Sequence, residues 1–183
     1  MPLDNQQELF DICDPYDRVM GQATRGEVHA RKLLHRAVHI WVFNSRGELL
    51  LHRRSAKKDE SPLCYTSSAS GHLSAGEDYA LAATRELQEE LGLVGELEFL
   101  TKLPAGLETA FEHTVLYRTV SDAHPTPDLD EIESVEYIAP EELTRRLNAA
   151  PEQFSPPFRV LWMWYVSTPD GCAAAGASHG MRS

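Results

Sequence analysis

The hydrophobic and polar positions in the first half of the chain predict short strands joined by tight turns. The strongest apolar run, Ala37–Phe43, is followed by the turn Asn44–Gly47 and by a second strand over Glu48–His52. Two such runs around a polar turn indicate a β-hairpin. Ahead of this hairpin, Glu8–Asp14 and Val19–Thr24 are predicted as two further strands.

The second half of the chain adds more strands and two helices. Strands are predicted over Glu96–Leu103, Thr109–Val120 and Val135–Ile138. A proline in its first turn predicts a helix from Pro140 to about Asn148, and the aromatic-rich segment Pro151–Ser167 predicts a last helix. Mixed strands with segregated helices favour an α/β or α+β sandwich.

A further predicted helix, Tyr79–Leu91, carries the clearest polar pattern of the chain. Asp78 is a good N-cap, Tyr79–Leu91 contains neither proline nor glycine, and Gly92 supplies a C-terminal stop. A helix in this register is expected to turn one stripe of residues towards the core. The stripe consists of Ala80, Thr84, Leu87 and Leu91.

Three carboxylates share another face of this helix, because Glu86, Glu89 and Glu90 are spaced i, i+3 and i+4. Carboxylates so close repel one another unless a positive group lies among them. A hard divalent cation suits oxygen ligands, so we expect Mg2+, with Mn2+ as the alternative. Arg85 is an i, i+4 partner of Glu89 and can orient its carboxylate. The loop Gly71–Gly76 ahead of the helix would let the backbone approach the cation.

A basic cluster follows the predicted hairpin, at Arg53, Arg54, Lys57 and Lys58. Two interpretations stay open: a solvated loop, or a rim that contacts substrate phosphates near the carboxylates. On the second interpretation, Arg53, Arg54 and Lys58 bind substrate. His72 is more simply a substrate or backbone contact than a metal ligand, since the other expected ligands are oxygens.

Composition and charge narrow the classes of partner. The 183 residues are predicted to hold one domain over 1–168 and a disordered tail rich in Gly, Ala and Ser over 169–183. A net charge of -11 argues against nonspecific binding to nucleic acid or to an anionic membrane. We find no signal peptide and no membrane-spanning segment, and three widely spaced cysteines fit a reducing compartment, so we expect a cytoplasmic protein. The oligomeric state is open, a homodimer included.

The helix and the loop before it also carry a family pattern. Its fixed positions are Gly71, Glu77, Arg85, Glu86, Leu87, Glu89, Glu90, Gly92 and Leu93. In these residues the chain resembles the Nudix hydrolases, which cleave a diphosphate linked to another group X, and it matches their box without a gap. The resemblance implies the Nudix fold, a mixed sheet between helices. It also implies that the Gly71 carbonyl is a metal ligand and that Glu77 pairs with Arg85.

A second, narrower resemblance is to isopentenyl-diphosphate isomerase, a branch of the same superfamily. It is carried by LLHRAVHIWVFNSRGELLLHRRSAKK, TSSASGHL and PEQFSPPF. The isomerase has a catalytic cysteine where this chain has Ser70, and a hydroxyl is a poorer proton donor and acceptor than a thiol. It also has a Glu-x-Glu pair, of which this chain keeps Glu112 and has Ala110 in place of the first.

Histidines complete the comparison with the isomerase, whose metal is held largely by histidines. His29, His35 and His72 stand near those positions, although the spacing of the first two differs from the isomerase's. His39 lies on an apolar strand and is predicted to be a core histidine. Glu112 is expected on the strand face opposite to Phe111, His113, Val115 and Tyr117.

The sequence therefore predicts a Mg2+-dependent hydrolase that cleaves a diphosphate linkage in a nucleoside diphosphate derivative or a related organic diphosphate. Glu86, Glu89, Arg85 and Glu112 are the catalytic candidates, and Gly71, Glu86, Glu89 and Glu90 are the metal ligands. The alternatives are an isomerase of isoprenoid diphosphates and a noncatalytic module that senses a nucleotide. The intact carboxylate set argues against the last of these. The sequence does not identify the group X.

Overall fold

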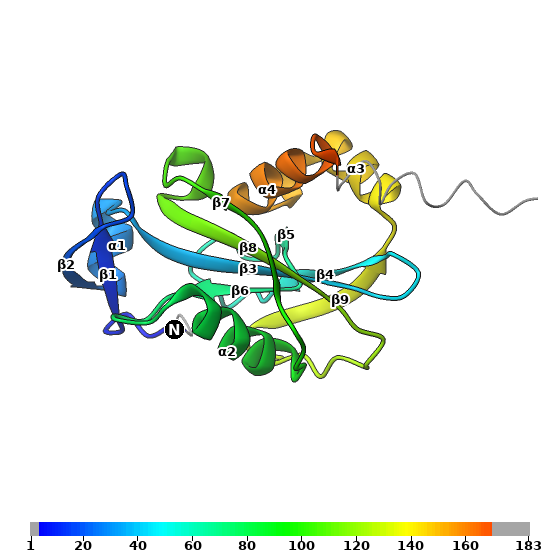
Figure 1. The fold of residues 1–183 in the computed structure, drawn as a ribbon, viewed down its shortest axis with the longest axis horizontal. Coiled ribbons are helices and arrows are strands. Elements are labelled where there is room, and N and C mark those ends of the chain that lie inside the picture. The colour runs from blue at the N-terminus through cyan, green and yellow to red at the C-terminus, as the bar shows by residue number, and fades with distance from the viewer. Residues whose placement is uncertain (1–3, 170–183) are drawn as a thin grey trace, which may run out of the picture.

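Two β-sheets organise the chain in the computed structural model, which describes residues 4–169 (Figure 1). The strands are β1 Leu9–Cys13, β2 Val19–Thr24, β3 His35–Phe43, β4 Leu49–Arg54, β5 Tyr65–Thr66, β6 Ala69–His72, β7 Glu98–Leu103, β8 Glu112–Val120 and β9 Ile132–Ile138. The helices are α1 Arg25–Arg31, α2 Tyr79–Leu91, α3 Pro140–Ala149 and α4 Pro156–Val166, with 3-10 turns at Leu107–Thr109 and Pro151–Gln153. β1 and β2 form the small sheet, and the other strands form the main one.

β3 is the middle strand of the main sheet, whose order is β5-β4-β3-β8-β7. It pairs in parallel with β8 along its whole length, whereas its other pairs are antiparallel. On the side away from β8, β3 meets β4 only at Phe43↔Leu49, and β6 pairs with Ala37–Ile40 instead. β3 and β4 therefore diverge, which leaves room between them for side chains of β6 and α2.

Helices cover both faces of the main sheet: α2 lies on one face, and α3 and α4 lie on the other (Figure 1). Alternate residues of β3 supply the two cores. Val38, Ile40 and Val42 pack towards α2, whereas Trp41 and Phe43 pack towards α4. The predicted α/β sandwich, a mixed sheet between helices, is confirmed.

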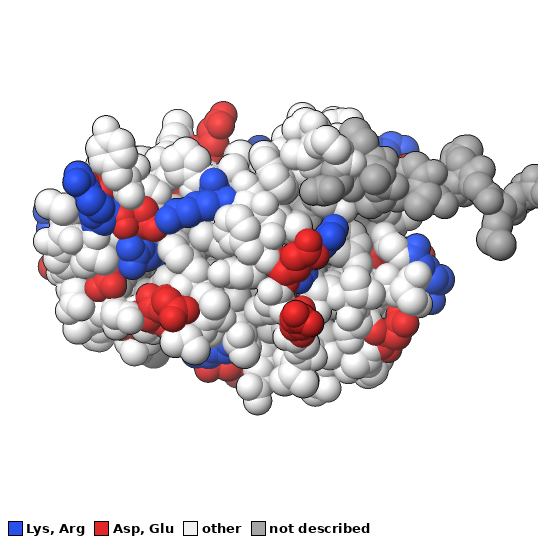
Figure 2. Space-filling view, viewed as in Figure 1, with Lys and Arg blue, Asp and Glu red and all other residues white. Residues whose placement is uncertain are grey.

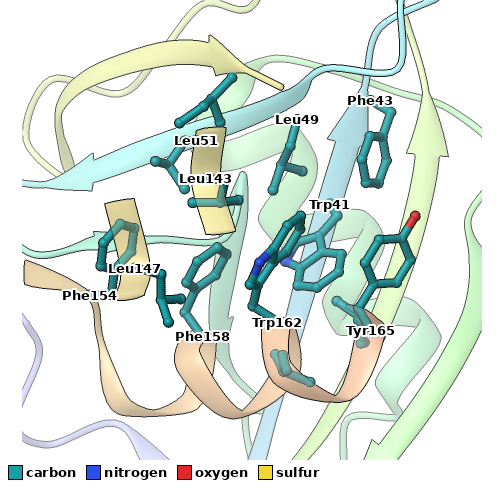
Figure 3. Close-up of a cluster of buried hydrophobic side chains, with 13 residues drawn as sticks. Trp41, Phe43, Leu49, Leu51, Leu143, Leu147, Phe154, Phe158, Trp162 and Tyr165 are labelled. Carbon is teal, nitrogen blue, oxygen red and sulfur yellow. The ribbon is translucent and has the colours of Figure 1, made fainter. Parts of the chain in front are cut away.

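The core beneath α4 is aromatic (Figure 3). The ring centroid of Trp41 lies 5.5 Å from that of Trp162 and 5.2 Å from that of Tyr165, and Phe158 stacks on Trp162 at 6.3 Å. Aromatic side chains bury large apolar areas and prefer defined relative orientations. This packing fixes the position of α4 and of its first turn at Pro156.

β1, β2 and α1 form a small unit beside the main sheet (Figure 1). Its buried apolar residues are Phe10, Ala23 and Val28. Asp17 attaches the β1–β2 turn to the main fold, because it accepts hydrogen bonds from Arg36 Nε at 2.6 Å, from the Tyr79 hydroxyl at 3.0 Å and from Lys102. Although burial opposes ionisation, the hydrogen bonds from Lys102 and Arg36 lower the pKa of Asp17 to about 2.

The predicted strands are confirmed, with one difference that matters for the site. β8 begins at Glu112 rather than at Thr109, because Ala110 and Phe111 adopt φ angles of 54° and 66° after a 3-10 turn. Phe111 therefore lies outside the strand, and the expectation that it shares a strand face with His113 is wrong.

α1 is a helix that the sequence analysis does not predict. A capping box begins it: Thr24 Oγ1 accepts a hydrogen bond from Glu27 N at 3.3 Å, and Glu27 Oε2 accepts one from Thr24 N at 3.1 Å. The signal was present in the sequence, since a Thr with a Glu three residues later is typical of a helix start. This helix carries His29 and begins at Arg25.

Two predictions concern the ends of the chain. The predicted tail, 169–183, lies outside the described residues apart from Pro169, and the single domain over 1–168 stays a prediction. Within residues 4–169, no helix combines the length and the apolar character needed to cross a membrane.

Candidate active site

A cavity of about 940 Å³ lies where β3 and β4 diverge. Its walls come from α2, β3, β6 and the end of β4, together with the starts of β8, α1 and α4. Most of the predicted site residues line it: Gly71, His72, Arg54, Lys58, Arg85, Glu86, Glu89, Glu90 and Glu112.

α2 brings the three carboxylates to this cavity. It begins at Asp78, whose side chain accepts a hydrogen bond from Leu81 N at 2.9 Å, and it ends at Gly92 with φ of 64°, as predicted. Its buried face differs from the predicted stripe, because Ala80 and Thr84 are exposed. The buried residues are Ala82, Ala83, Glu86, Leu87, Glu90 and Leu91. Two of the three carboxylates therefore lie on the buried face of the helix.

Burial dominates the chemistry of these two carboxylates. Glu86 and Glu90 are 9% and 6% exposed, whereas the Glu89 side chain is 61% exposed. Because burial disfavours the charged form, the pKa of Glu86 rises to about 7. Burial, and then the neighbouring Glu86, also raise the pKa of Glu90. Glu90 Oε2 accepts a hydrogen bond from Ser70 N at 3.1 Å.

Gly71 permits the close approach of Glu86. A Cβ atom at Gly71 would lie 2.0 Å from Glu86 Oε1, which is shorter than any contact between non-bonded atoms. Gly71 is part of β6 and not of a loop, so the predicted loop starts two residues later, after His72. A glycine is required here by the space that the carboxylate occupies and not by an unusual φ angle.

Arg85 orients the acidic groups, and the pairing with Glu77 that the family resemblance implied is present. Its Nε and Nη2 donate to the two oxygens of Glu77, both at 2.9 Å. Its Nη1 donates to Glu86 Oε1 at 2.7 Å and to Glu89 Oε2 at 3.1 Å. The hydrogen bonds that Arg85 donates to Glu77, and then the negative charge of Glu86, raise the pKa of Arg85. Since its donors are committed to carboxylates, Arg85 is placed to position ligands.

These residues fit a divalent cation of the kind that Nudix enzymes generally use. Glu86, Glu89, Glu90 and the Gly71 carbonyl would supply oxygen ligands, which Mg2+ prefers. The space that a Cβ at Gly71 would fill is kept for a carboxylate, and burial raises the pKa values of both Glu86 and Glu90, although Arg85 donates a hydrogen bond to Glu86. A cation bound among these oxygens would offset the cost of burying both charges.

A second group of ligand atoms lies around His72, which lines the same cavity. The side chains of His29, His35 and His72 offer nitrogen atoms within 4.8 Å of one another, and so do the donor atoms of Glu60, His72 and Glu112. Glu112 Oε1 is 3.1 Å from His72 Nε2 and 4.0 Å from His35 Nε2. Burial raises the pKa of Glu112 to about 7. The structure thus places Glu112 among histidines.

The hydrogen bonds of the histidines define which nitrogens are free. His35 Nδ1 lies 2.9 Å from the Leu33 carbonyl and must donate to it, so its buried Nε2 keeps a lone pair without a partner in the described chain. His29 Nε2 is likewise buried and unpartnered among residues 4–169. Burial lowers the pKa of His35 to about 4 and lowers that of His29, so both stay neutral near pH 7. Neutral nitrogens with free lone pairs suit a metal ion.

Comparison with known proteins agrees with this geometry. The NUDIX domain family matches residues 33–158, more than half of the chain. The chain belongs to the Nudix family. This assignment confirms the resemblance of the box and of the fold, and it makes the chain a member of a hydrolase family.

Individual relatives of this Nudix protein include both hydrolases and isomerases. An uncharacterized Nudix hydrolase of Streptomyces coelicolor is 44% identical over 102 residues, which cover 55% of this chain and 56% of that protein. The isopentenyl-diphosphate Delta-isomerase of Pectobacterium atrosepticum is 34% identical over 157 residues, covering 81% of this chain and 86% of the isomerase. The crystal structure of DR0079 from Deinococcus radiodurans is similar with a TM-score of 0.76 and 28% identity, covering 86% of this chain and 98% of that one.

The predicted basic contacts of this Nudix domain divide into two groups. Arg54 and Lys58 line the cavity, but Arg53 does not: its Nε donates to the Leu63 carbonyl at 3.1 Å, and its guanidinium lies over the Tyr65 ring. This difference follows from the alternation of side chains along β4. Lys58 Nζ pairs with both Asp4 and Glu131 at 2.5 Å, so this cation is held at the cavity wall.

Arg25 is a cavity residue that the sequence analysis missed. Its Nη1 donates to His72 Nδ1 at 3.1 Å, and its Nη2 donates to Asp59 Oδ1 at 3.1 Å. Because His72 Nδ1 accepts this bond, His72 Nε2 carries the proton that faces Glu112. The His72 ring therefore forms hydrogen bonds with two side chains and not with the backbone. The basic, histidine-rich sequence around Arg25 was the available signal.

The face of the molecule shown in Figure 2 carries mixed charge. On the face shown in Figure 2, acidic and basic side chains are interspersed among uncharged ones. Such a face offers little to a polyanion. The absence of a nucleic-acid or membrane partner nevertheless stays a prediction.

We expect the stabilising effect of Mg2+ to increase with pH. The pKa of Glu86 is about 7 in the folded protein against 4.5 ordinarily, so the metal-free fold binds more protons than the unfolded chain between these values. Its free energy of unfolding therefore falls as pH rises through this window, and Mg2+, which needs the ionised carboxylate, offsets the loss above about pH 7. Melting temperatures with and without Mg2+ should differ more at pH 8 than at pH 6, and Glu86→Gln should reduce that dependence. Equal shifts at both pH values would contradict the placement of the cation.

We expect Gly71→Ala to disturb the carboxylates more than the fold. The new methyl group must displace the Glu86 carboxylate, a flexible side-chain end, so we expect a loss of about 1–3 kcal/mol in the free energy of unfolding. The Mg2+ concentration needed for half-maximal stabilisation should rise at least about tenfold, since one ligand is moved. Gly106→Ala is the matched control, because nothing lies within 4 Å of its Cβ position. Unchanged Mg2+ dependence in Gly71→Ala would show that Glu86 is not a ligand.

Proposed function

We propose that this Nudix protein is a Mg2+-dependent enzyme that hydrolyses a diphosphate linkage in a nucleoside diphosphate derivative or a related organic diphosphate. The observation that carries the proposal is the pair of buried carboxylates, Glu86 and Glu90, which face a cavity and lie against a backbone kept bare at Gly71. Burying two acids beside each other is costly unless they bind a cation. A solvated acidic surface would not need this arrangement.

The residues of the chain divide the work of such a reaction. A divalent cation supplies charge neutralisation for the diphosphate oxygens and makes water a better nucleophile at neutral pH. Arg85 keeps the carboxylates of Glu86 and Glu89 in place. Arg54 and Lys58 bring positive charge to the cavity wall, where they can contact phosphate oxygens.

The base that activates the attacking water can be either Glu86 on α2 or Glu112 on β8. Glu86 and Glu112 each have a pKa raised by burial to about 7, which is near the pH at which an intracellular base is most effective. Glu86 lies with the other helix carboxylates, and Glu112 accepts a hydrogen bond from His72. We assign Glu86 to the cation and to proton transfer, and Glu112 to a second cation or to proton transfer.

The second candidate function is isomerisation of an isoprenoid diphosphate. One observation favours it: His29, His35, His72 and Glu112 come together as the resemblance to the isomerase requires, despite the changed spacing along the chain. Isomerisation needs a proton donor and a proton acceptor, and both positions are changed in this chain. Ser70 stands in place of the thiol, and Ala110, which lines the cavity, stands in place of the carboxylate. Hydrolysis therefore remains the preferred function.

Glu89→Gln should fold normally and lose most of the activity. Its side chain is 61% exposed, so the free energy of unfolding should change by less than about 0.5 kcal/mol. Loss of one negative ligand should lower kcat by about 10²-fold, the scale of a lost electrostatic contact in the transition state. Glu96→Gln is the control, since Glu96 is exposed and lies outside the cavity. Turnover near that of the unchanged protein at saturating Mg2+ would remove Glu89 from the site.

The two enzymatic functions differ in the bond that breaks. With isopentenyl diphosphate and Mg2+ we expect no dimethylallyl diphosphate, and we expect Ser70→Cys alone not to produce it, because Ala110 still lacks a carboxylate. In heavy-oxygen water, a cleaved diphosphate compound should carry the label in a phosphate product. Release of phosphate, tested over a panel of diphosphate compounds, identifies the substrate. Isomer formation at a rate similar to any hydrolysis would favour the second function.

A further inference from the structure

One wall of the cavity is made of neutral hydrogen-bonding groups that the proposed mechanism does not use. This neutral wall consists of His39, Thr66, Ser70 and Ser155, all of which line the cavity. His39 and Ser70 are opposite each other on β3 and β6, and Ser155 Oγ lies 2.9 Å from Thr66 Oγ1. Ser70 N donates to Glu90, so the wall begins directly beside the carboxylates.

His39 is held in a single neutral form. Trp41 Nε1 can only donate, so Ser67 Oγ accepts from it at 2.9 Å, and the same oxygen lies 2.8 Å from His39 Nδ1. Ser67 is fully buried, and no other acceptor for its proton exists among residues 4–169, so it donates to Nδ1. The other ring nitrogen, Nε2, therefore carries a proton. Burial lowers the pKa of His39 to about 3, which keeps the ring neutral.

The Nε2–H group of His39 has hydrogen-bonding capacity to spare. Nε2 has no protein partner in the described chain, and it is not among the fully enclosed polar atoms, so it is open to the cavity. The hydroxyl of Ser70 has no hydrogen bond to residues 4–169 either. Thr66 and Ser155 share one hydrogen bond, which leaves one hydroxyl proton for another acceptor. His39 is thus a core residue, as predicted, with one polar edge facing the site.

The apolar residues that line the cavity are all small or cyclic. Among the described residues that line it, the apolar ones are Ala37, Ala110, Pro156 and Pro157, with no Phe, Trp, Tyr, Leu, Ile, Val or Met. A nucleobase is usually held by stacking on an aromatic ring, and a prenyl chain needs large aliphatic or aromatic neighbours. The described residues that line this cavity offer neither an aromatic ring for stacking nor a large aliphatic side chain. Three hydroxyls and an imidazole N–H instead suit oxygen atoms that both donate and accept.

We propose that the neutral wall binds the hydroxyl groups of a sugar attached to the diphosphate, with His39 Nε2–H donating to one of them. The inference rests on the proposed function for the position of the diphosphate beside Glu90. The wall then recognises the sugar of a nucleoside diphosphate or sugar diphosphate and leaves any base outside the cavity. A group X without hydroxyls would leave these buried donors unpaired, which sites of this kind reject.

The test compares ADP with 2′,3′-dideoxy-ADP, which share a base and a diphosphate and differ only in the sugar hydroxyls. Dissociation constants are measured by titration of the Mg2+-loaded protein. ADP should bind at least about tenfold more tightly than the dideoxy compound, as for the loss of one or two hydrogen bonds. CDP should bind within about threefold of ADP. Isopentenyl diphosphate, which has a diphosphate and no hydroxyl, should bind no better than the dideoxy compound.

Two variants assign the effect to the neutral wall. His39→Leu removes the donor at similar volume and should reduce the preference for ADP over the dideoxy compound to about twofold or less, whereas His39→Gln keeps an N–H donor and should retain most of it. Ser70→Ala changes a half-buried position and serves as a second variant should His39→Leu fail to fold. It should weaken the binding of ADP and leave the binding of the dideoxy compound unchanged. Equal binding of ADP and its dideoxy analogue to the unchanged protein would overturn the proposal. Equal weakening of both compounds in His39→Leu would overturn it as well, since the contact would then be to phosphate or structural.

The ring nitrogens of His39 give a readout that does not depend on turnover. Nitrogen chemical shifts of the labelled protein, assigned by their loss in His39→Gln, should show the Nε2–H form at pH 7 and should change with ADP but not with the dideoxy compound.

The sugar subsite and the hydrolase assignment can fail separately. If ADP is preferred over the dideoxy compound and no diphosphate compound is hydrolysed, the sugar subsite stands and the hydrolase assignment fails. If hydrolysis occurs without any preference for the hydroxyls, the assignment stands and the subsite fails.

Discussion

Placing the carboxylates of Glu86 and Glu90 on the buried face of α2 is the constraint on which the site depends. Most amphipathic helices put apolar residues on that face, and this one replaces two of them with acids. The bare backbone at Gly71, the clamp of Arg85 and the divergence of β3 from β4 all make room for these charges or offset them. Free energy that a fully apolar face would have contributed to folding is given up to bring two carboxylates to the cavity.

The parts of the site that are local in sequence could be predicted. α2 begins at Asp78 and ends at Gly92 as expected, because a cap and a stop act within one turn of the helix. The Glu77–Arg85 pair also followed from the pattern of the box. The predicted buried stripe was right at Leu87 and Leu91 and wrong at Ala80 and Thr84, which are exposed, because hydrophobicity alone assigned it. Glu86 and Glu90, which the pattern placed on a separate face, lie on the buried one.

Features that join distant segments could not be predicted. His39 acquires its tautomer from Ser67, which lies 28 positions away in the segment between β5 and β6. The spacing of His29 and His35 gave no sign that α1 brings the first ring to 5.5 Å from the second. Arg53 and Arg54 are neighbours in sequence, yet alternation along β4 turns only the second towards the cavity. These placements depend on which strands pair and in which register. Local sequence patterns do not reveal either of these.

The small unit of β1, β2 and α1 supplies one part of the cavity wall, and the main fold supplies most of the rest. Its own apolar cluster supports it, and Asp17 fastens its turn to β3, α2 and β7 through polar bonds. Arg25 therefore reaches the cavity on this small unit, whereas the three carboxylates lie on α2, which packs against the main sheet. Substitutions in α1 can therefore alter Arg25 and His29 without changing the carboxylates of α2. The charge beside His72 and the acidic face of α2 can in this way be tuned separately on one scaffold.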